Sequence, residues 1–428
     1  MTSNDSEERV AAQAPAPAAA PPGAPASAPS SAPASVPPAA PASVPPAAPA
    51  SVPPGGGAGL PALRGHNAAL VLGLLRSAGP TGVSRLELAA HTGLTPQAVS
   101  KITARLRADG LAAEAGRRAS TGGKPRTVLC LVPEARYAIG LHLDRDELTA
   151  VLTDLAGRTV AERTAPLDFG AGAPAVLDTV AGQLAALPDE ARSPRVLGVG
   201  AACPGPLDHT AGVLRRVTGF PAWDGFPLRD ALAGRLGLPV VLDKDTNAAA
   251  LGLAQREPDG RGSFGYLHLG TGLGAGLVLG GALYRGARTG AGEFGHQVLQ
   301  LDGPPCGCGK RGCVEALCLD RAARGEPAEA ARILGTAAAN LVELLDIDRV
   351  LLGGRTVLSR PGTYVRGVAE ALAEQARVRG DGRTSAVPVA LAEGGARAVA
   401  DGAAHLVLAP LFGAPGAPFG AATATGVR

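Results

Sequence analysis

The chain has 428 residues, which is room for about two or three domains, and a formal net charge of only +3. No run of its sequence approaches the roughly eighteen consecutive apolar residues of a membrane-spanning helix, and acidic residues precede any apolar run at the N-terminus, the wrong order for a secretory signal. Membrane spans are therefore excluded, and because aromatic residues make up only 3% of the chain, its core must rest on Leu, Val and Ala.

Residues 12–58 form a tract of Pro, Ala and Ser. The octad Pro-Ala-Ser-Val-Pro-Pro-Ala-Ala occurs at 33–40 and again at 41–48. Such a segment has too little apolar area to offset the entropy cost of ordering, so residues 1–60 are expected to be a disordered tail of extended, polyproline-like character. A passive solubilising arm is the favoured interpretation, and a ligand for a proline-reading partner is the alternative.

Positive charge is concentrated in the next segment, residues 61–133. Ten Lys or Arg and three Asp or Glu give this segment a net charge of +7, whereas the tail and the remainder of the chain each sum to −2. A small basic module in an otherwise weakly charged protein is typical of nucleic-acid binding, although charge alone is also found on solvated faces.

Helical signals divide this module into three helices. The first follows the apolar spacing of residues 70–75. Ser84 and Glu87 are placed as a capping box for the second, and Thr95 and Pro96 supply the N-cap and first residue of the third. Two short helices joined by a Gly-containing turn predict a helix-turn-helix, whose second helix enters the major groove of DNA. The candidates for DNA contacts lie off the apolar stripe of that helix: Gln97, Ser100, Lys101 and Arg105.

Two short strands, expected at 111–116 and 126–132, would complete a winged helix-turn-helix domain over residues 61–133. The turn between them carries the sequence Gly-Lys-Pro-Arg, which is similar to basic arms that reach into a narrow minor groove. Lys124 and Arg126 are therefore further candidates for DNA contacts. The alternative is a three-helix module that binds protein, which the basic wing disfavours.

From residue 137 onward, short apolar strands alternate with helical segments. Strands are expected at 137–143, 148–154, 196–201, 240–242, 264–269, 274–279 and 350–352. Helices are expected at 173–187, 227–236, 246–255, 314–323, 327–345 and 361–378. Two successive sets of strands with helical crossovers predict two α/β lobes with a cleft between them. Lobe one is expected at about 134–242 and lobe two at about 243–412, within a domain that covers residues 134–428.

A metal-binding pattern lies in the second lobe. His296 is followed after nine residues by a Gly-rich loop that carries Cys306, Cys308 and Cys313, three of the six cysteines. Three thiolates and one imidazole form a closed tetrahedral zinc set, so we expect one structural Zn²⁺ per chain rather than a hydrolytic one. The alternative is a chance cluster of buried thiols. Clustered thiols without a secretory signal also favour a cytoplasmic location.

The order of motifs in this domain resembles the ROK family, which joins sugar repressors and sugar kinases. The resemblance rests on five segments. Gly-Val-Gly-Ala-Ala-Cys-Pro-Gly-Pro lies within 197–208, and the strand-to-helix junction Asp-Lys-Asp-Thr-Asn-Ala-Ala-Ala lies within 238–250. They are followed by a glycine-rich loop at 268–276, Gly-Glu-Phe-Gly-His at 292–296 and Cys-Val-Glu at 313–315. A Gly-x-Gly string alone is weak evidence, but the ordered set is specific. It covers residues 61–412 and implies an actin-like, hexokinase-type α/β fold that holds a sugar between two lobes.

Carried over position by position, the resemblance implies roles for five residues. Asp245 would be the carboxylate that faces the sugar hydroxyl phosphorylated by kinases. Glu293, His296 and Glu315 would hydrogen-bond sugar hydroxyls, with His296 giving its other ring nitrogen to zinc. Asn247 would support the pocket by helix capping and by bonds behind it. The alternative for Asp245 and Asn247 is that they simply cap the following helix.

The chain departs from the kinase pattern at its first turn. Kinase members carry Asp-x-Gly-Gly-Thr there, whereas His142 replaces the Asp in this chain, and Asp144 and Arg145 replace the two glycines. Bulk and negative charge should block the approach of nucleotide phosphates, so we expect kinase activity to be lost and Asp245 to be a vestigial base. Lys244 stands where the family usually has Asn, which leaves open a sugar acid, a phosphosugar or a degenerate pocket.

The leading hypothesis is a transcriptional regulator of carbohydrate-related genes, specifically a repressor and not an enzyme. One alternative is a sugar kinase of the ROK type with an appended DNA-binding domain. Another is an effector-independent DNA binder with a vestigial sugar domain. The expected partners are operator DNA, a small sugar or sugar-derivative effector, and further copies of the chain in a dimer or tetramer, because helix-turn-helix modules usually read paired half-sites.

Overall fold

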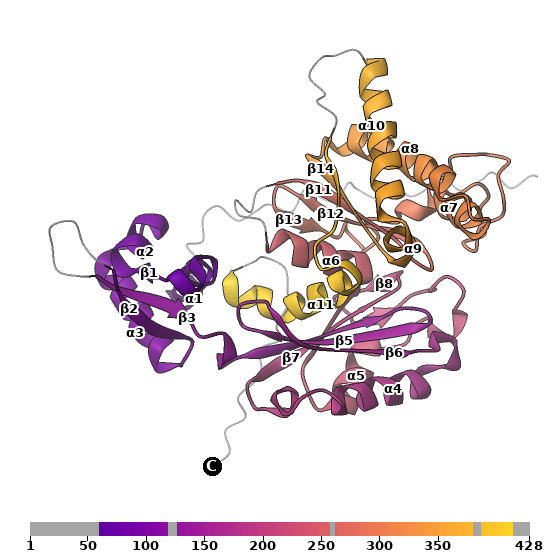
Figure 1. Ribbon diagram of the computed structural model, residues 1–428. Helices are drawn as coiled ribbons and strands as arrows, with labels where there is room; N and C mark the ends of the chain where they lie inside the picture. Colours follow the sequence, from indigo (N-terminus) through magenta and orange to yellow (C-terminus); the bar gives the residue numbers. More distant parts are fainter. Residues whose placement is uncertain (1–59, 119–125, 257–261, 380–386, 414–428) are drawn as a thin grey trace, which may run out of the picture. The chain divides into compact units, whose positions relative to one another are not determined.

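The computed structural model describes residues 60–118, 126–256, 262–379 and 387–413 (Figure 1). Residues 1–59 of the expected tail, and Lys124 at the expected wing tip, lie outside these described residues. Among the helices in the described ranges, none is long and apolar enough to cross a membrane. The chain from Ala58 onward forms one compact unit, in which a small N-terminal module precedes two α/β lobes.

The N-terminal module has three helices, α1 (Leu60–Ala78), α2 (Arg85–Thr92) and α3 (Pro96–Ala108). Its strands are β1 (Val83–Ser84), β2 (Ala112–Arg118) and β3 (Arg126–Leu131), which form a sheet of order β1-β3-β2. At the start of α2, Ser84 Oγ accepts a hydrogen bond from the Glu87 N–H at 3.3 Å, and Glu87 Oε2 accepts one from the Ser84 N–H at 2.7 Å. Thr95 Oγ1 accepts from the Ala98 N–H at 3.2 Å at the start of α3. The predicted capping box and N-cap are confirmed, and the elements follow the order predicted for a winged helix-turn-helix.

The first lobe is built on a five-stranded sheet of order β10-β7-β4-β5-β6. Its strands are β4 (Tyr137–Leu143), β5 (Glu147–Asp154), β6 (Thr159–Pro166), β7 (Val196–Cys203) and β10 (Val240–Lys244). Helices α4 (Ala173–Ala185) and α5 (Leu228–Leu236) cover one face, where Ile139, Val176 and Leu232 belong to one buried cluster. A short hairpin of β8 (Leu207–Asp208) and β9 (Val213–Leu214) follows β7.

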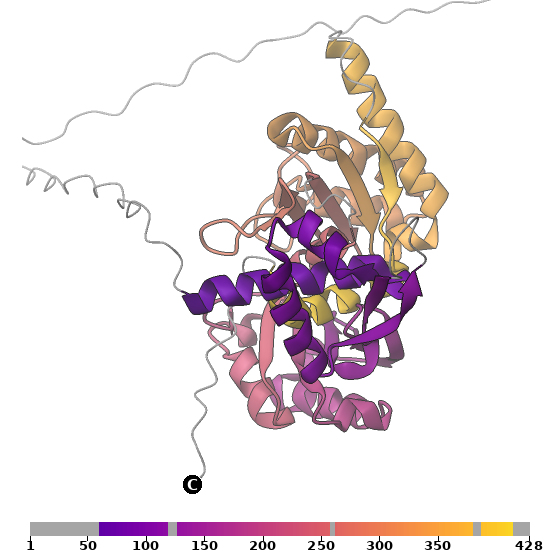
Figure 2. The same cartoon turned by 90° about the vertical axis from the view of Figure 1, so that its left-hand side faces the viewer.

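The second lobe repeats this plan on a sheet of order β13-β12-β11-β14-β15 (Figure 2). Its strands are β11 (Phe264–Leu269), β12 (Leu273–Leu279), β13 (Ala282–Tyr284), β14 (Arg349–Gly353) and β15 (Val389–Leu391). Its helices are α7 (Val314–Ala323), α8 (Pro327–Leu345), the short α9 (Arg355–Ser359) and α10 (Pro361–Arg379). All seven strands and six helices predicted beyond residue 137 are present, and the two-lobed α/β fold is confirmed.

Two further helices lie between the sheets (Figure 1). α6 (Asp245–Ala254) rests on the second lobe, where a Cβ added to Gly276 of β12 would lie 2.1 Å from the carbonyl oxygen of Thr246. α11 (Ala398–Leu408) rests on the first lobe, where a Cβ added to Gly200 of β7 would lie 1.8 Å from the carbonyl oxygen of Ala403. Only glycine fits at such distances, so each helix backbone lies directly on a strand of its own lobe.

The two central helices also meet through a glycine. A Cβ added to Gly402 of α11 would lie 2.0 Å from the carbonyl oxygen of Ala248 of α6. Because α11 completes the first lobe although it follows the second in sequence, the expectation of one continuous second lobe over 243–412 is wrong at its C-terminal end. The helix was not predicted because all of its residues are buried, which leaves no polar face to mark a helical period.

We expect Gly402→Ala to lower the free energy of unfolding by about 1–3 kcal/mol or more, because the added methyl group must displace the α6 backbone. The matched control is Gly182→Ala in α4, where a Cβ meets no atom within 4 Å. That change should raise the free energy of unfolding by about 0.5–1 kcal/mol. Urea unfolding followed by circular dichroism measures both, and a neutral Gly402→Ala would contradict direct packing of the two helices.

Candidate functional site: a cleft between the lobes

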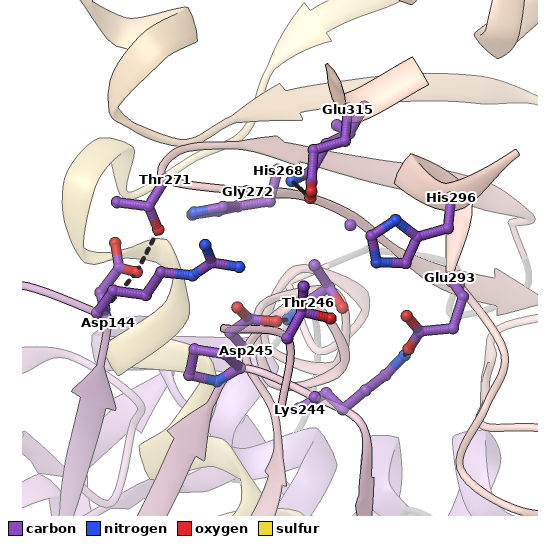
Figure 3. A pocket seen from close by; sticks show the side chains of 17 residues that line it. Asp144, Lys244, Asp245, Thr246, His268, Thr271, Gly272, Glu293, His296 and Glu315 are labelled. Carbon is purple, nitrogen blue, oxygen red and sulfur yellow. Dashed lines mark hydrogen bonds and ion pairs between the residues drawn. The ribbon is translucent and has the colours of Figure 1, made fainter. Parts of the chain in front are cut away.

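A cavity opens between the two lobes, with an empty volume of about 590 Å³ that includes the solvent at its mouth. Its wall comes from the turn after β4, the junction of β10 with α6, the β11–β12 turn, the loop before the cysteines and the start of α7. Figure 3 shows Asp245, Glu293, His296 and Glu315 around this one space. Four of the five residues assigned to a ligand are thus brought together by elements far apart in sequence.

Asp245 enters the cavity from the first turn of α6. Its Oδ1 accepts a hydrogen bond from the Thr246 N–H at 2.6 Å. Burial, partly offset by nearby groups, raises the pKa of its carboxyl above the ordinary value. Because the carboxyl group lines the cavity, it can form a hydrogen bond with a hydroxyl group bound there.

Asn247 is not part of the cavity wall. It is fully buried, and its Nδ2 donates to Asp243 Oδ1 at 2.8 Å. The other oxygen of Asp243 accepts from Arg285 Nε at 2.7 Å. Asn247 therefore lies behind the β10–α6 junction, in the supporting position that the resemblance implies, and its inclusion among the ligand-binding residues stays a prediction.

Lys244 lies in the cavity wall, but its charge is compensated within the protein. Its side chain is only 3% exposed, and Nζ donates to Glu293 Oε1 at 3.0 Å and to the carbonyl oxygen of Ala291 at 2.6 Å. The pair joins the end of a first-lobe strand to a second-lobe loop. The charge that Lys244 was expected to bring to the pocket is thus matched, and Glu293 has less capacity left to accept from a ligand.

Direct lobe-to-lobe contacts occupy the turn after β4. Asp144 Oδ1 accepts from Thr271 Oγ1 in the β11–β12 turn at 2.8 Å. Arg355 of α9 forms an ion pair with Asp146 at 2.5 Å and lies 3.7 Å from Asp144 Oδ2. Arg145 also lines the cavity, with Nη2 3.3 Å from where a Cβ of Gly272 would be. The turn that carries glycines in kinases is therefore filled by side chains and closed by bonds across the cleft.

His296, Cys306, Cys308 and Cys313 form a group whose ligand atoms all lie within 4.8 Å of one another. Cys306 Sγ is 3.7 Å from His296 Nδ1, and the sulfurs of Cys308 and Cys313 are 3.7 Å apart. A tetrahedron with metal–sulfur bonds of about 2.3 Å has edges of about 3.8 Å, so this spacing suits a metal ion at the centre.

The loop backbone sets this spacing. Cys306 N–H donates to the carbonyl oxygen of Lys310 at 2.8 Å, which closes a tight turn around Cys308. Gly312 has φ +63°, and a Cβ there would lie 1.6 Å from the carbonyl oxygen of Gln300, so no other residue fits. The glycines of the motif therefore place the thiols, as the sequence pattern indicated.

His296 and Glu315 connect this group to the cavity. Both line the cavity, and the Nδ1 of His296 faces the thiols. Glu315 Oε2 accepts from the Leu273 N–H at 2.8 Å, and Cys306 Sγ lies 3.9 Å from Oε1. One imidazole thus belongs to both the cysteine group and the cavity wall.

Two histidines in the cavity region were not predicted as site residues. His268 lines the cavity, and its Nδ1 is 2.8 Å from the hydroxyl oxygen of Tyr266. Its ring lies edge-on to that of His142, with centroids 6.0 Å apart. Burial lowers the pKa of His142 to about 4, more than any neighbouring charge does. His268 could have been found as the one imidazole in an otherwise apolar strand, directly before the glycine-rich loop.

The candidate DNA-contacting residues of α3 lie outside the cleft. Gln97, Ser100, Lys101 and Arg105 are exposed, whereas Val99, Thr103 and Leu106 on the opposite side are buried. Arg126, the first residue of β3, is also exposed. The described candidates therefore form a polar surface on α3 and at the wing.

Comparisons with known proteins agree with this architecture. Residues 138–326 match the model of the ROK family. The chain is 29% identical over 245 residues to the xylose repressor of Caldicellulosiruptor bescii, a match that covers 56% of this chain and 61% of the repressor. It is 32% identical to the ROK hexokinase of Thermus thermophilus, with a TM-score of 0.51 and coverage of 63% of this chain and 96% of that structure.

A larger part of the chain matches a ROK family transcriptional regulator described as a homologue of the E. coli MLC protein. That structure has a TM-score of 0.65 at 22% identity, covering 82% of this chain and 97% of the other, and it shares the fold. The chain spans about three fifths of the length of the curated repressors it matches first, 61–62%.

We expect the stability of the protein to fall between pH 6.5 and pH 4 partly through His142. Because burial holds the folded pKa at about 4, below the ordinary 6.5, the unfolded chain binds a proton there that the folded chain excludes. Between pH 7 and pH 4, the free energy of unfolding should fall less in His142→Gln than in the wild type. The difference between the two decreases should be up to about 3 kcal/mol. The control His91→Gln, at an exposed position, should follow the wild type in urea unfolding. Identical pH dependence in all three proteins would show that folding does not lower the pKa of His142.

Proposed function

Since the chain belongs to the ROK family, we propose that it is a transcriptional repressor that binds operator DNA through residues 61–133 and a sugar-like effector in the cleft. One observation carries the proposal. The same chain combines an exposed polar face on α3 with a cavity lined by the acidic side chains Asp245, Glu293 and Glu315. The relatives named as xylose repressors support the same reading.

The surface of α3 supports DNA binding. Its exposed residues alternate with a buried stripe, which is how a recognition helix presents side chains to the major groove. We assign base contacts to Gln97, Ser100 and Lys101. We assign phosphate or minor-groove contacts to Arg105, Lys124 and Arg126, three of the ten basic residues of the module.

The cleft supports a neutral or weakly charged sugar. Lys244 is matched by Glu293, so the pocket keeps hydrogen-bond acceptors at Asp245 and Glu315 and a ring nitrogen of His296. Such a set suits sugar hydroxyls, which are good donors to carboxylates. The sugar class is expected to include pentoses or hexoses, and derivatives belong in the same tests.

A sugar kinase with an appended DNA-binding module is the second candidate, favoured by the similarity to the Thermus thermophilus hexokinase. The contacts of Asp144 with Thr271 and of Asp146 with Arg355 argue against it. They fill the turn where a nucleotide would place its phosphates, and the acidic groups would repel a triphosphate. A coupled assay of ADP release with D-glucose, D-xylose and N-acetylglucosamine separates the two, since turnover with any of them would favour the kinase.

We assign zinc to the group formed by His296, Cys306, Cys308 and Cys313, at one ion per chain. Three thiolates and an imidazole are a typical zinc set, and their spacing suits bonds of about 2.3 Å to sulfur. The four ligands leave no coordination position for an activated water. The ion would instead hold the His296 ring so that its other nitrogen faces the cavity.

The function is tested by selecting binding sites for the full chain from a random DNA library. Fluorescence anisotropy on the selected site, with and without D-xylose, D-glucose and N-acetylglucosamine, then measures the effector response. A sugar should change the dissociation constant for DNA about tenfold in the wild type and much less in Glu315→Gln. If no DNA is enriched, the regulator proposal fails. If DNA is enriched but sugars and their acid and phosphate derivatives have no effect, the effector-independent DNA binder takes its place.

Substitutions in the N-terminal module should separate phosphate from base contacts. Arg105→Ala and Arg126→Ala should each weaken binding to all DNA sequences and reduce the slope of log K against log salt by about one per bound subunit. Gln97→Ala should instead change the preferred sequence, with a loss of about 1–3 kcal/mol per base contact. Salt titrations on the selected site and on a scrambled site measure the two effects, and wild-type behaviour of all three variants would show that this surface does not read DNA.

Removal of one metal ligand should lower metal content and stability together. Cys308→Ser leaves an incomplete coordination shell, and metal affinity is partly folding free energy. We expect about one zinc per chain in the freshly purified wild type by elemental analysis, with less zinc and a lower melting temperature in the variant. Cys318→Ser, at a buried cysteine outside the group, is the control that should keep its zinc. Wild-type protein without zinc would contradict the assignment.

A further inference from the structure

The N-terminal module is anchored to the first lobe. β3 continues through residues 132–135 into β4, and the Leu155 N–H donates to the carbonyl oxygen of Pro133 at 3.0 Å. The buried cluster that contains Leu75 of α1 also contains Ala138 of β4 and Ala404 of α11. The module should therefore move with the first lobe and with α11.

A single side chain extends this contact to α6. Near the end of α1, Arg76 Nη2 donates to Gln255 Oε1 at 2.9 Å, and Gln255 is the C-cap of α6. The same guanidinium lies over the ring of Phe412, 3.9 Å from its centroid, in the turn that follows α11. Arg76 thus contacts both the C-cap of α6 and the turn that follows α11.

The surroundings make this contact sensitive to geometry. Burial lowers the pKa of Arg76 to about 10. Its Nη1 is buried and has no hydrogen-bond partner among the residues that the structure describes. Arg76 and Gln255 are both partly buried, and because Nη1 has no acceptor in the described part of the chain, the guanidinium depends on its hydrogen bond to Gln255 more than an exposed arginine would.

The opposite end of α6 forms part of the cavity wall. Asp245 and Thr246 line the cavity, and the ten residues of the helix span about 15 Å from there to Gln255. α6 is seated on the second lobe at Gly276, and α11 is seated on the first lobe at Gly200. A rotation of one lobe against the other must therefore turn α6 relative to α11 and move Gln255 relative to Phe412.

We propose that Arg76 couples the cleft to the N-terminal module, because it contacts both the C-cap of α6 and the turn after α11 and is displaced when one of them moves relative to the other. When the lobes close or open, Gln255 moves with α6 while Phe412 stays with α11, and the guanidinium that bridges them transmits the displacement to α1. This inference rests on the proposed function, in which a displacement of α1 changes the spacing of paired recognition helices on DNA.

The coupling can be tested without knowing the effector, by loosening the lobes through a residue outside the cavity wall. Arg355 joins the lobes through Asp146. In hydrogen-exchange mass spectrometry of the full chain, Arg355→Gln should raise the exchange rates of α1 amides at 70–78 about fivefold over the wild type. In a Gln255→Ala background, the same change should add no further increase, because the link from α6 to Arg76 is already missing.

The controls separate coupling from a general loss of structure. Ser77→Ala, at an exposed position beside Arg76, should leave the fivefold increment intact, and exchange in β7 should stay constant in every variant. An equal increment with and without Gln255→Ala overturns the proposal, as does the absence of any increment in the wild-type background. A wild type that binds no DNA but shows the predicted non-additivity would reject the proposed function and leave the coupling standing.

Discussion

Contact of backbone against backbone, with no side chain between, sets the geometry of this molecule. The two central helices touch at Gly402 and Ala248, and each lies directly on one sheet through Gly200 or Gly276. A close-packed contact of this kind cannot be compressed, so the lobes have few ways to move except by turning about it. A chain with 60 glycines and few aromatic residues is suited to such a core, because small residues let main chains approach.

The charges around the cleft are largely paired inside the protein. Lys244 with Glu293, Asp243 with Arg285, and Asp146 with Arg355 are three ion pairs that join the lobes. Two of them involve a side chain that is almost fully buried, and such pairs cost more to break than exposed ones because one charge is left without water. The lobes of this protein are thus held together by ion pairs between their own side chains.

Features governed by local rules could be predicted from the sequence. The Ser84–Glu87 capping box depends on residues three apart, and the cysteine group depends on a short glycine-rich loop. Features governed by distant contacts could not. α11 has no helical period because it is buried on all sides, and β6 is a polar edge strand whose residues are mostly exposed. The pairing of Lys244 with Glu293 joins positions 49 residues apart, so the residue type at 244 suggested a charged pocket that the fold neutralises.

His296 stands with one ring nitrogen toward the cysteine thiols and the rest of the ring in the wall of the cleft. An imidazole shared in this way cannot serve two occupants independently. Whatever free energy an ion in the cysteine group adds to the binding of a molecule in the cleft, that molecule must add in equal measure to the binding of the ion. If the proposed zinc and the proposed effector both bind, a shortage of the ion would raise the effector concentration needed for a response, and bound effector would help the chain to retain its ion. His296 would then couple the proposed response to the sugar with the proposed occupancy by zinc.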